Sequence, residues 1–218
     1  MSLRARVPSG RVLGLAAVAF SLLYLISDGV EALQGGFSRP QLWLTLAAEA
    51  AVPVIVVGLY RAQRPQIGRL GRVSAITYAY SFTFFTATVV YALAARSPDY
   101  RALSAALQPW MTLHGALMVF AGIGFARAVV RAGILPRWTG AALAAGVVLV
   151  AAAQGAPEGV QVLAAGIRDM AFAGMGLALL RAPARARFGH QDRRTAVRLT
   201  SGRRTVQPQG VAERRHPQ

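Results

Sequence analysis

Cysteine and lysine are both absent from the 218-residue sequence, and acidic residues are scarce. Without cysteine the chain can form no disulfide, no thiolate nucleophile and no cysteine-ligated metal site. Without lysine it cannot hold retinal or another carbonyl cofactor as a Schiff base. All 24 basic residues are therefore arginines, and with only 8 acidic residues the net charge is +16.

The short motifs that membrane enzymes carry are absent as well. The sequence has no H-E-x-x-H motif, no G-x-S-x-G turn, no phosphate loop and no clustered histidines. His114 alone lies in an apolar stretch, because His190 and His216 are near the C-terminus, so a haem held by two histidines would lack its second ligand. We therefore predict a protein that is not an enzyme and that uses no cofactor.

Long apolar stretches dominate what is present. Hydrophobic residues make up 55% of the chain and charged residues only 15%, whereas a soluble domain needs more polar surface. A membrane-spanning helix needs about 20 mostly apolar residues. The sequence predicts an all-α, polytopic transmembrane bundle over residues 12–181, with six spans at 12–33, 42–60, 73–95, 110–130, 138–154 and 159–180. Residues 1–11 are predicted to be a cytoplasmic segment, and residues 182–218 a disordered, arginine-rich cytoplasmic tail.

The distribution of arginines predicts the orientation of these spans. The N-terminal segment, the loops after the second and fourth spans and the C-terminal tail together hold 20 arginines, whereas the loops on the opposite side hold 3. Arginine-rich loops stay in the cytoplasm. We therefore expect both termini to be cytoplasmic in a multi-pass protein of the cell's inner (plasma) membrane, with the first span as a retained signal anchor.

Three local features refine the expected fold. Pro53 lies inside the second span and predicts a kink there. Ser97 and Pro98 are suited to the cap and first turn of a short surface helix, although a solvated loop fits equally. Glycines within residues 121–124 and 171–176 predict close helix packing.

Five ionisable residues are expected inside the bilayer: Asp28, Glu49, His114, Arg168 and Asp169. Charged groups at that depth are costly, so they should face the bundle interior and meet one another. One hypothesis is an outward-facing acidic cavity that binds or transports a small cation or polar solute. The alternative is a structural or interaction subunit of a membrane complex, in which these charges form internal ion pairs that hold the helices together.

Arg168 and Asp169 are adjacent, and adjacent helical residues point about 100° apart. We therefore expect Glu49 or Asp28, on other helices, to be the better partner for Arg168. Glu31 and Glu158 lie nearer the interface and are predicted to be hydrated. No metal site is predicted, because the acidic residues and His114 show no ligand spacing.

The arginine-rich tail predicts the partners outside the bundle. It follows the last span directly, and basic residues beside a membrane gain about 1 kcal/mol each from an anionic leaflet. We therefore favour lipid over nucleic acid as its contact, with a solvated topogenic tail as the plainest interpretation. The sequence does not identify protein partners.

The loop at residues 131–140 reads Arg-Ala-Gly-Ile-Leu-Pro-Arg-Trp-Thr-Gly and enters an apolar span. It is similar to a loop in small multi-pass bacterial membrane proteins that are grouped as domains of unknown function, in which a Leu-Pro-Arg-Trp-x-Gly turn joins two late spans. The resemblance implies about six helices and no known activity, and it transfers no functional residues.

Overall fold

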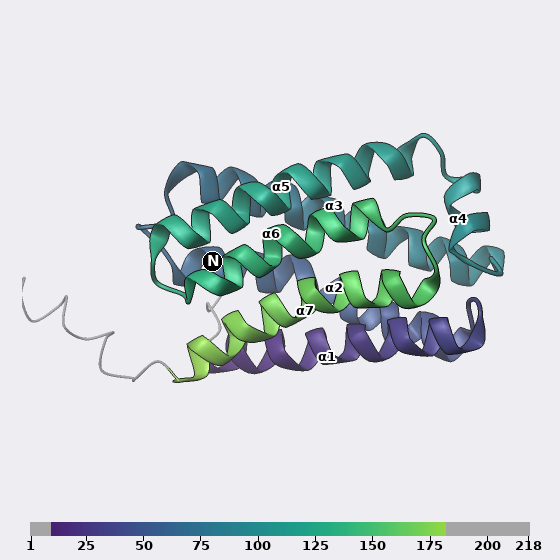
Figure 1. Ribbon diagram of the computed structural model, residues 1–218, viewed down its shortest axis with the longest axis horizontal. Coiled ribbons are helices and arrows are strands. Elements are labelled where there is room, and N and C mark those ends of the chain that lie inside the picture. Colours follow the sequence, from purple (N-terminus) through teal and green to yellow (C-terminus); the bar gives the residue numbers. More distant parts are fainter. Residues whose placement is uncertain (1–9, 182–218) are drawn as a thin grey trace, which may run out of the picture. The chain divides into compact units, whose positions relative to one another are not determined.

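The computed structural model describes residues 10–181, and in this part of the chain every regular element is a helix (Figure 1). The predicted all-α class is therefore confirmed. The predicted N-terminal segment falls almost wholly outside the described residues, and the tail with its lipid contact falls wholly outside them. The helices are α1 (Gly10–Gln34), α2 (Arg39–Ala62), α3 (Gly68–Ala95), α4 (Tyr100–Ala106), α5 (Trp110–Ala132), α6 (Arg137–Ala152) and α7 (Glu158–Arg181).

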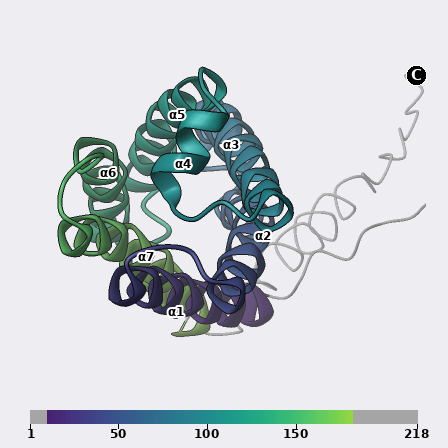
Figure 2. The same cartoon turned by 90° about the vertical axis from the view of Figure 1, so that its right-hand side faces the viewer.

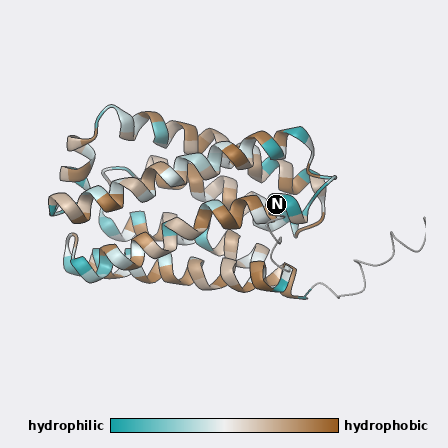
Figure 3. Ribbon diagram, turned by 180° about the vertical axis from the view of Figure 1, so that it is seen from behind, coloured by the Kyte–Doolittle hydropathy of each residue, from teal (hydrophilic) through white to brown (hydrophobic). Residues whose placement is uncertain are grey.

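Five of these helices are long and apolar enough to cross a membrane: α1, α2, α3, α5 and α7. Helix α6 is also apolar but has 16 residues. Large apolar side chains such as Leu15, Val54, Phe120 and Leu163 are exposed on the bundle, and Figure 3 shows hydrophobic residues along the helices. An exposed apolar surface of this extent suits lipid rather than water, so the helices indicate a membrane protein.

The six longer helices follow one another around a ring. Each packs against its neighbours in the chain, and α7 closes the ring by packing along α1. Figure 2, seen from the end that carries α4, shows this arrangement. Successive helices run antiparallel, so nine arginines gather toward the opposite end, which we call the arginine end: Arg11, Arg61, Arg64, Arg69, Arg72, Arg127, Arg131, Arg137 and Arg181. The α4 end carries Arg39, Arg96 and Arg101.

Glycines bring neighbouring helices into direct backbone contact, and one of them, Gly176, lies in a stretch for which the sequence predicts close packing. A β-carbon on Gly14 would lie 2.7 Å from the carbonyl oxygen of Gly176, and one on Gly176 would lie 2.6 Å from that of Gly14. On the other side of α7, a β-carbon on Gly146 of α6 would lie 2.5 Å from the backbone nitrogen of Arg168. Helix α7 is therefore held between α1 and α6 with no room for larger side chains at these points.

The packed hydrophobic core contains several large side chains that are fully or almost fully buried. Tyr78 packs edge-to-face on Phe82, with ring centroids 5.1 Å apart, and stacks on Phe172 at 6.3 Å. Phe125 and Met175 are fully buried in the same cluster. This core closes the interior of the ring below the cavity described next.

Helix α4 lies across the α4 end and is anchored by Leu103, which packs with Leu42, Val89 and Ala92 in a second apolar cluster. The prediction that Ser97 caps this helix is wrong. Asp99 is the cap, and its carboxylate accepts a hydrogen bond of 2.8 Å from the backbone N–H of Ala102. Arg96 adopts a left-handed conformation and ends α3 immediately before Ser97. Because Ser97 still belongs to the turn that leaves α3, the next helix is capped two residues after it, by Asp99.

Candidate functional site

A cavity of about 660 Å³ lies inside the ring and extends from the α4 end into the bundle. Its rim includes the exposed residues Gln108, Gln154 and Glu158, whereas its floor includes the buried residues Glu49 and Arg168. The rim exposure shows that the cavity opens at the α4 end, beside α4 itself. Its volume lies within the range of small-molecule sites, about 300–1,000 Å³.

Most of the helices that line the cavity contribute a stripe of residues at helical spacing. Helix α1 supplies Tyr24, Asp28 and Glu31, and α2 supplies Gln41, Thr45 and Glu49, spaced three or four residues apart. Such residues share one face of a helix. Helix α5 supplies Met111, Thr112, Gly115 and Val119, with Gln108 just before its start. Helix α7 supplies Glu158, Gln161, Ala165 and Arg168. These stripes therefore converge on one space that is large enough for a small molecule, and those on α1, α2 and α7 carry most of its polar side chains.

The floor of the cavity lies deep in the bundle. Glu49 is ten residues from the start of α2 and Arg168 is ten residues from the start of α7. At 1.5 Å per residue both lie about 15 Å along their helices, near half of a hydrocarbon core of about 30 Å.

Tyr24 stands between the two charged residues of the floor. Its hydroxyl donates a hydrogen bond of 2.7 Å to Oε1 of Glu49, and the guanidinium carbon of Arg168 lies 4.6 Å from the centroid of its ring. Glu49 retains one carboxylate oxygen, Oε2, that is buried and has no hydrogen-bond partner among the described residues. Nη2 of Arg168 is likewise buried and has no hydrogen-bond partner among these residues. The floor therefore offers one carboxylate oxygen and one guanidinium nitrogen whose hydrogen bonds are unmet.

Arg168 pairs with Asp169, and the prediction that Glu49 or Asp28 is its partner is wrong. Nε of Arg168 donates to Oδ1 of Asp169 at 2.9 Å, in the one ion pair that the structure shows within residues 10–181. Adjacent helical positions point about 100° apart, but the long side chain of Arg168 bends far enough to reach Asp169. It does not reach Glu49, because Tyr24 lies between the two residues. Asp169 does not line the large cavity.

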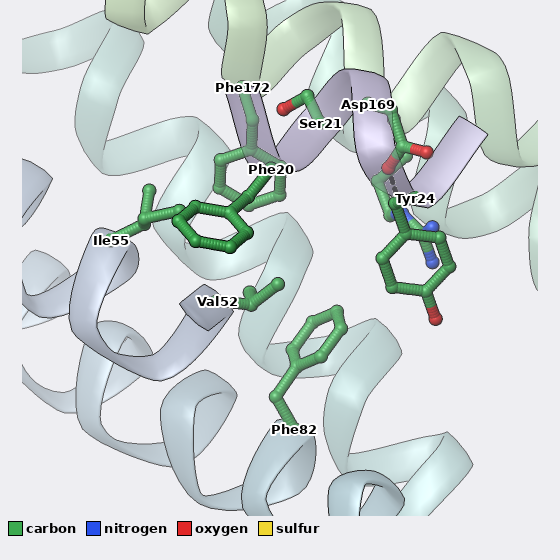
Figure 4. A pocket seen from close by; sticks show the side chains of 9 residues that line it. Phe20, Ser21, Tyr24, Val52, Ile55, Phe82, Asp169 and Phe172 are labelled. Atoms are coloured by element: carbon green, nitrogen blue, oxygen red, sulfur yellow. Dashed lines mark hydrogen bonds and ion pairs between the residues drawn. The ribbon is translucent and has the colours of Figure 1, made fainter. Parts of the chain in front are cut away.

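Below this pair the interior is almost closed. A second space of only about 10 Å³ lies there, and its wall is mainly aromatic and aliphatic. Figure 4 shows it, with the rings of Phe20, Phe82, Phe172 and Tyr24 around it and with the ion pair of Asp169 dashed. In this structure the large cavity is therefore open at one end and blocked at its floor.

A polar network joins α1 and α2 along the cavity wall. The amide nitrogen of Gln41 donates to Thr45 at 2.9 Å and to Glu31 at 3.2 Å, and the hydroxyls of Ser27 and Thr45 are 2.6 Å apart. Gln41 is 1% exposed, and its amide oxygen has no hydrogen-bond partner within residues 10–181. This network fixes Glu31 on the wall, so Glu31 lines the cavity, as does Glu158 at the rim.

His114 is not part of the cluster that the sequence predicts. Its ring stacks on Phe84, with centroids 3.7 Å apart, and lies within hydrogen-bond distance of the Tyr80 hydroxyl and the Trp110 carbonyl. It does not line the cavity. His114 therefore joins α3 to α5 in a packing role, because it points away from the face that carries Thr112 and Gly115.

The chemistry of the cavity favours positive charge. Asp28, Glu31, Glu49 and Glu158 line it, against Arg168 alone, whose charge is balanced by Asp169. Partial burial raises the pKa of the Tyr100 phenol at the rim, and the negative charges of Glu49 and Glu31 add to this shift. Tyr100 therefore stays neutral at physiological pH and presents an aromatic face beside the carboxylates.

Among the described residues, no three His, Asp or Glu side chains are close enough together to hold a metal ion. The carboxylates are spread along the wall instead, from Glu158 at the rim to Glu49 at the floor. The arrangement suits a ligand that extends through the cavity more than a single ion held by several ligands at once.

Sequence reasoning singled out Asp28, Glu49 and Arg168, and the structure places all three on the cavity. It missed Tyr24, Gln41 and Thr45. A signal for them existed, because Tyr24 precedes Asp28 by four residues and Gln41 and Thr45 precede Glu49 by eight and four. Polar residues that recur every four positions along an apolar helix indicate a face that contacts water.

No family model matches the chain, and no curated protein or solved structure is detectably similar to it. The resemblance of the loop at residues 131–140 to other bacterial membrane proteins stays a prediction.

Proposed function

We propose that the chain is an integral protein of a bacterial inner membrane with six spans and with both termini in the cytoplasm. The arginine end then faces the cytoplasm and the cavity opens to the outside. Support for the sixth span comes from the path of the chain, since α5 ends at the arginine end and α7 begins at the α4 end. Helix α6 has to connect these two ends, and it packs against both neighbours along the way.

The function that the site supports best is non-enzymatic binding or transport of a small cation or polar solute from the outside. The cavity carries this proposal, because it brings four carboxylates onto one space of about 660 Å³ that reaches about half-way across the membrane. Substrate sites near the midplane are typical of transport proteins. Carboxylates at this depth are costly unless a ligand, water or a partner compensates them.

A second candidate is a structural or interaction subunit of a membrane complex. The ion pair between Arg168 and Asp169 favours it, because both residues are buried and compensate each other inside one helix. This pair accounts for two of the intramembrane charges. It leaves Asp28 and Glu49 without a basic partner within the described residues, so the cavity is better explained by the first candidate.

Thiol labelling tests the cation cavity directly, because the chain has no cysteine of its own. Ala116 lines the cavity, whereas Ala87 is exposed on the bundle without lining it. In intact cells or oriented vesicles, Ala116→Cys should react faster with a positively charged methanethiosulfonate than with a negatively charged one. Ala87→Cys, facing lipid, should react slowly with both.

Introducing Glu49→Gln into the Ala116→Cys chain should reduce the preference for the positive reagent, because one negative charge leaves the floor. The amide keeps the size of the side chain and an oxygen for the Tyr24 hydroxyl. If Ala116→Cys does not react from the outside, or prefers the negative reagent, the cavity is not a cation site and the structural candidate replaces it.

A further inference from the structure

The cavity is too large and too widely lined for a bare metal ion. Its volume of about 660 Å³ exceeds the space of one water by more than an order of magnitude. Within residues 10–181, no three His, Asp or Glu side chains are close enough together to coordinate a metal. A ligand that uses the whole cavity therefore has a body of its own and contacts the wall over several helices.

Much of that wall is aromatic or otherwise apolar. Phe82 and Phe85 of α3 and Tyr24 of α1 line the deep half, and Met111 and Met118 of α5 also line the cavity. Aromatic faces attract cations, and the interaction is strongest away from bulk water. Methionine adapts to the shape of an apolar group. The wall therefore suits a hydrocarbon body next to a positive charge.

The floor supplies an anchor for that charge. Glu49 is 6% exposed, lines the cavity and retains one carboxylate oxygen that no described residue hydrogen-bonds. Its other oxygen is fixed by the Tyr24 hydroxyl at 2.7 Å, so the carboxylate is oriented before any ligand arrives. A buried carboxylate oxygen in this state is costly, and an N–H donor with positive charge compensates it best.

From this geometry, and resting on the proposed cation-binding function, we propose that the ligand is an organic ammonium ion with an apolar body. The ammonium group donates to Oε2 of Glu49 at the floor. The apolar body of the ligand lies along Tyr24, Phe82, Phe85 and the methionines of α5. The rim of the cavity, where the ligand enters, lies beside Tyr100 of α4. Asp28 and Glu31 higher on the wall attract the cation toward the floor.

Phenethylammonium is a suitable probe, since it joins one ammonium group to one aromatic body. We expect it to bind the full-length protein in lipid nanodiscs, as measured by isothermal titration calorimetry. Phenethyl alcohol, its neutral counterpart, should bind at least about tenfold more weakly, because it cannot form the charge-assisted bond. Sodium ions at equal ionic strength should not displace phenethylammonium.

Glu49→Gln should weaken phenethylammonium binding by roughly 10- to 100-fold, the scale of a lost hydrogen bond to a charged group. Asp99→Asn is the matched control, because Asp99 lies at the same end without lining the cavity, and asparagine also caps a helix. It should change the affinity by less than about twofold. Asp28→Asn provides a second cavity variant if Glu49→Gln does not fold.

The outcomes separate this inference from the proposed function. Equal binding of the alcohol, or unchanged binding in both cavity variants, would overturn the inference. Binding of sodium but not of phenethylammonium would also overturn it while leaving the proposed cation cavity in place. Preference for the zwitterion phenylalanine over phenethylammonium would assign the Nη2 atom of Arg168 to a ligand carboxylate and would replace the ammonium ligand. Absence of all binding, together with failure of the thiol labelling, would remove both proposals.

Discussion

Arg168 shows how one side chain decides between structural and binding roles. It is 5% exposed, holds Asp169 through Nε and leans over the rings of Tyr24 and Phe82. Those contacts fix its position, while Nη2 has no hydrogen-bond partner in the described part of the chain, and Arg168 lines the cavity floor. Arg168 is therefore first a positioning residue that holds Asp169 and Tyr24, and it also gives the floor its one positive charge.

The pairing of Arg168 is tested by two double-mutant cycles on unfolding in detergent. Arg168→Ala should destabilise the protein by about 3–5 kcal/mol, because it leaves the buried carboxylate of Asp169 uncompensated. Adding Asp169→Asn should recover part of that loss, whereas adding Glu49→Gln should recover less. A larger coupling to Glu49 than to Asp169 would show that the arginine reaches across the bundle, as its sequence position suggests.

At the scale of elements, the packing of α6 against α7 positions the floor. Gly146 of α6 lies directly on the backbone of Arg168. Gly174 of α7 lies against the ring of Trp138, which is in the first turn of α6. The two helices approach so closely because both positions lack a β-carbon. The contact with α6 thereby helps to fix the position of Arg168 at the cavity floor.

Gly146→Ala should force α6 and α7 apart, because the new β-carbon would lie 2.5 Å from the nitrogen of Arg168 and 2.7 Å from its α-carbon. Backbone atoms cannot move aside cheaply, so we expect a loss of about 1–3 kcal/mol in unfolding free energy. Gly29→Ala on α1 is the control, since nothing lies within 4 Å of its β-carbon. That variant should be neutral or more stable by up to about 1 kcal/mol. Equal effects of the two substitutions would show that the close approach is not rigid.

At the scale of the whole molecule, the ring of antiparallel helices places the connections alternately at its two ends. The arginine end carries nine arginines and the α4 end three within the described residues. Basic residues stay on the cytoplasmic side during insertion. The orientation that we propose for the cavity rests on this asymmetry, so the proposed direction of ligand entry depends on the topology.

Single-cysteine variants test the topology in intact cells with a membrane-impermeant maleimide. Ala105→Cys on α4 and Gln154→Cys between α6 and α7 should be labelled from the outside. Gln66→Cys and Ile134→Cys, in exposed connections at the arginine end, should be labelled only after permeabilisation. Ile134 and Gln154 flank α6, so labelling of both from the same side would remove the sixth span and contradict the proposed orientation.

The sequence by itself determined the helical class and the approximate positions of the helices, because apolar stretches of spanning length leave few alternatives. The predicted spans differ from the helices by at most a few residues at each end, most clearly at α3, which begins at Gly68 rather than near Val73. It also identified Asp28, Glu49 and Arg168, because charged residues are rare in apolar stretches. These inferences depend on properties that each segment carries alone.

Only the tertiary structure decided which of these residues meet. His114 looks similar to Glu49 in sequence, yet it stacks on Phe84 outside the cavity because its helical face turns toward α3. Asp169 rather than Glu49 pairs with Arg168 because Tyr24 stands between them. Such outcomes depend on the rotation of each helix about its axis and on the close approaches at Gly14 and Gly146. Packing between distant segments sets both, and no single stretch of sequence contains that information.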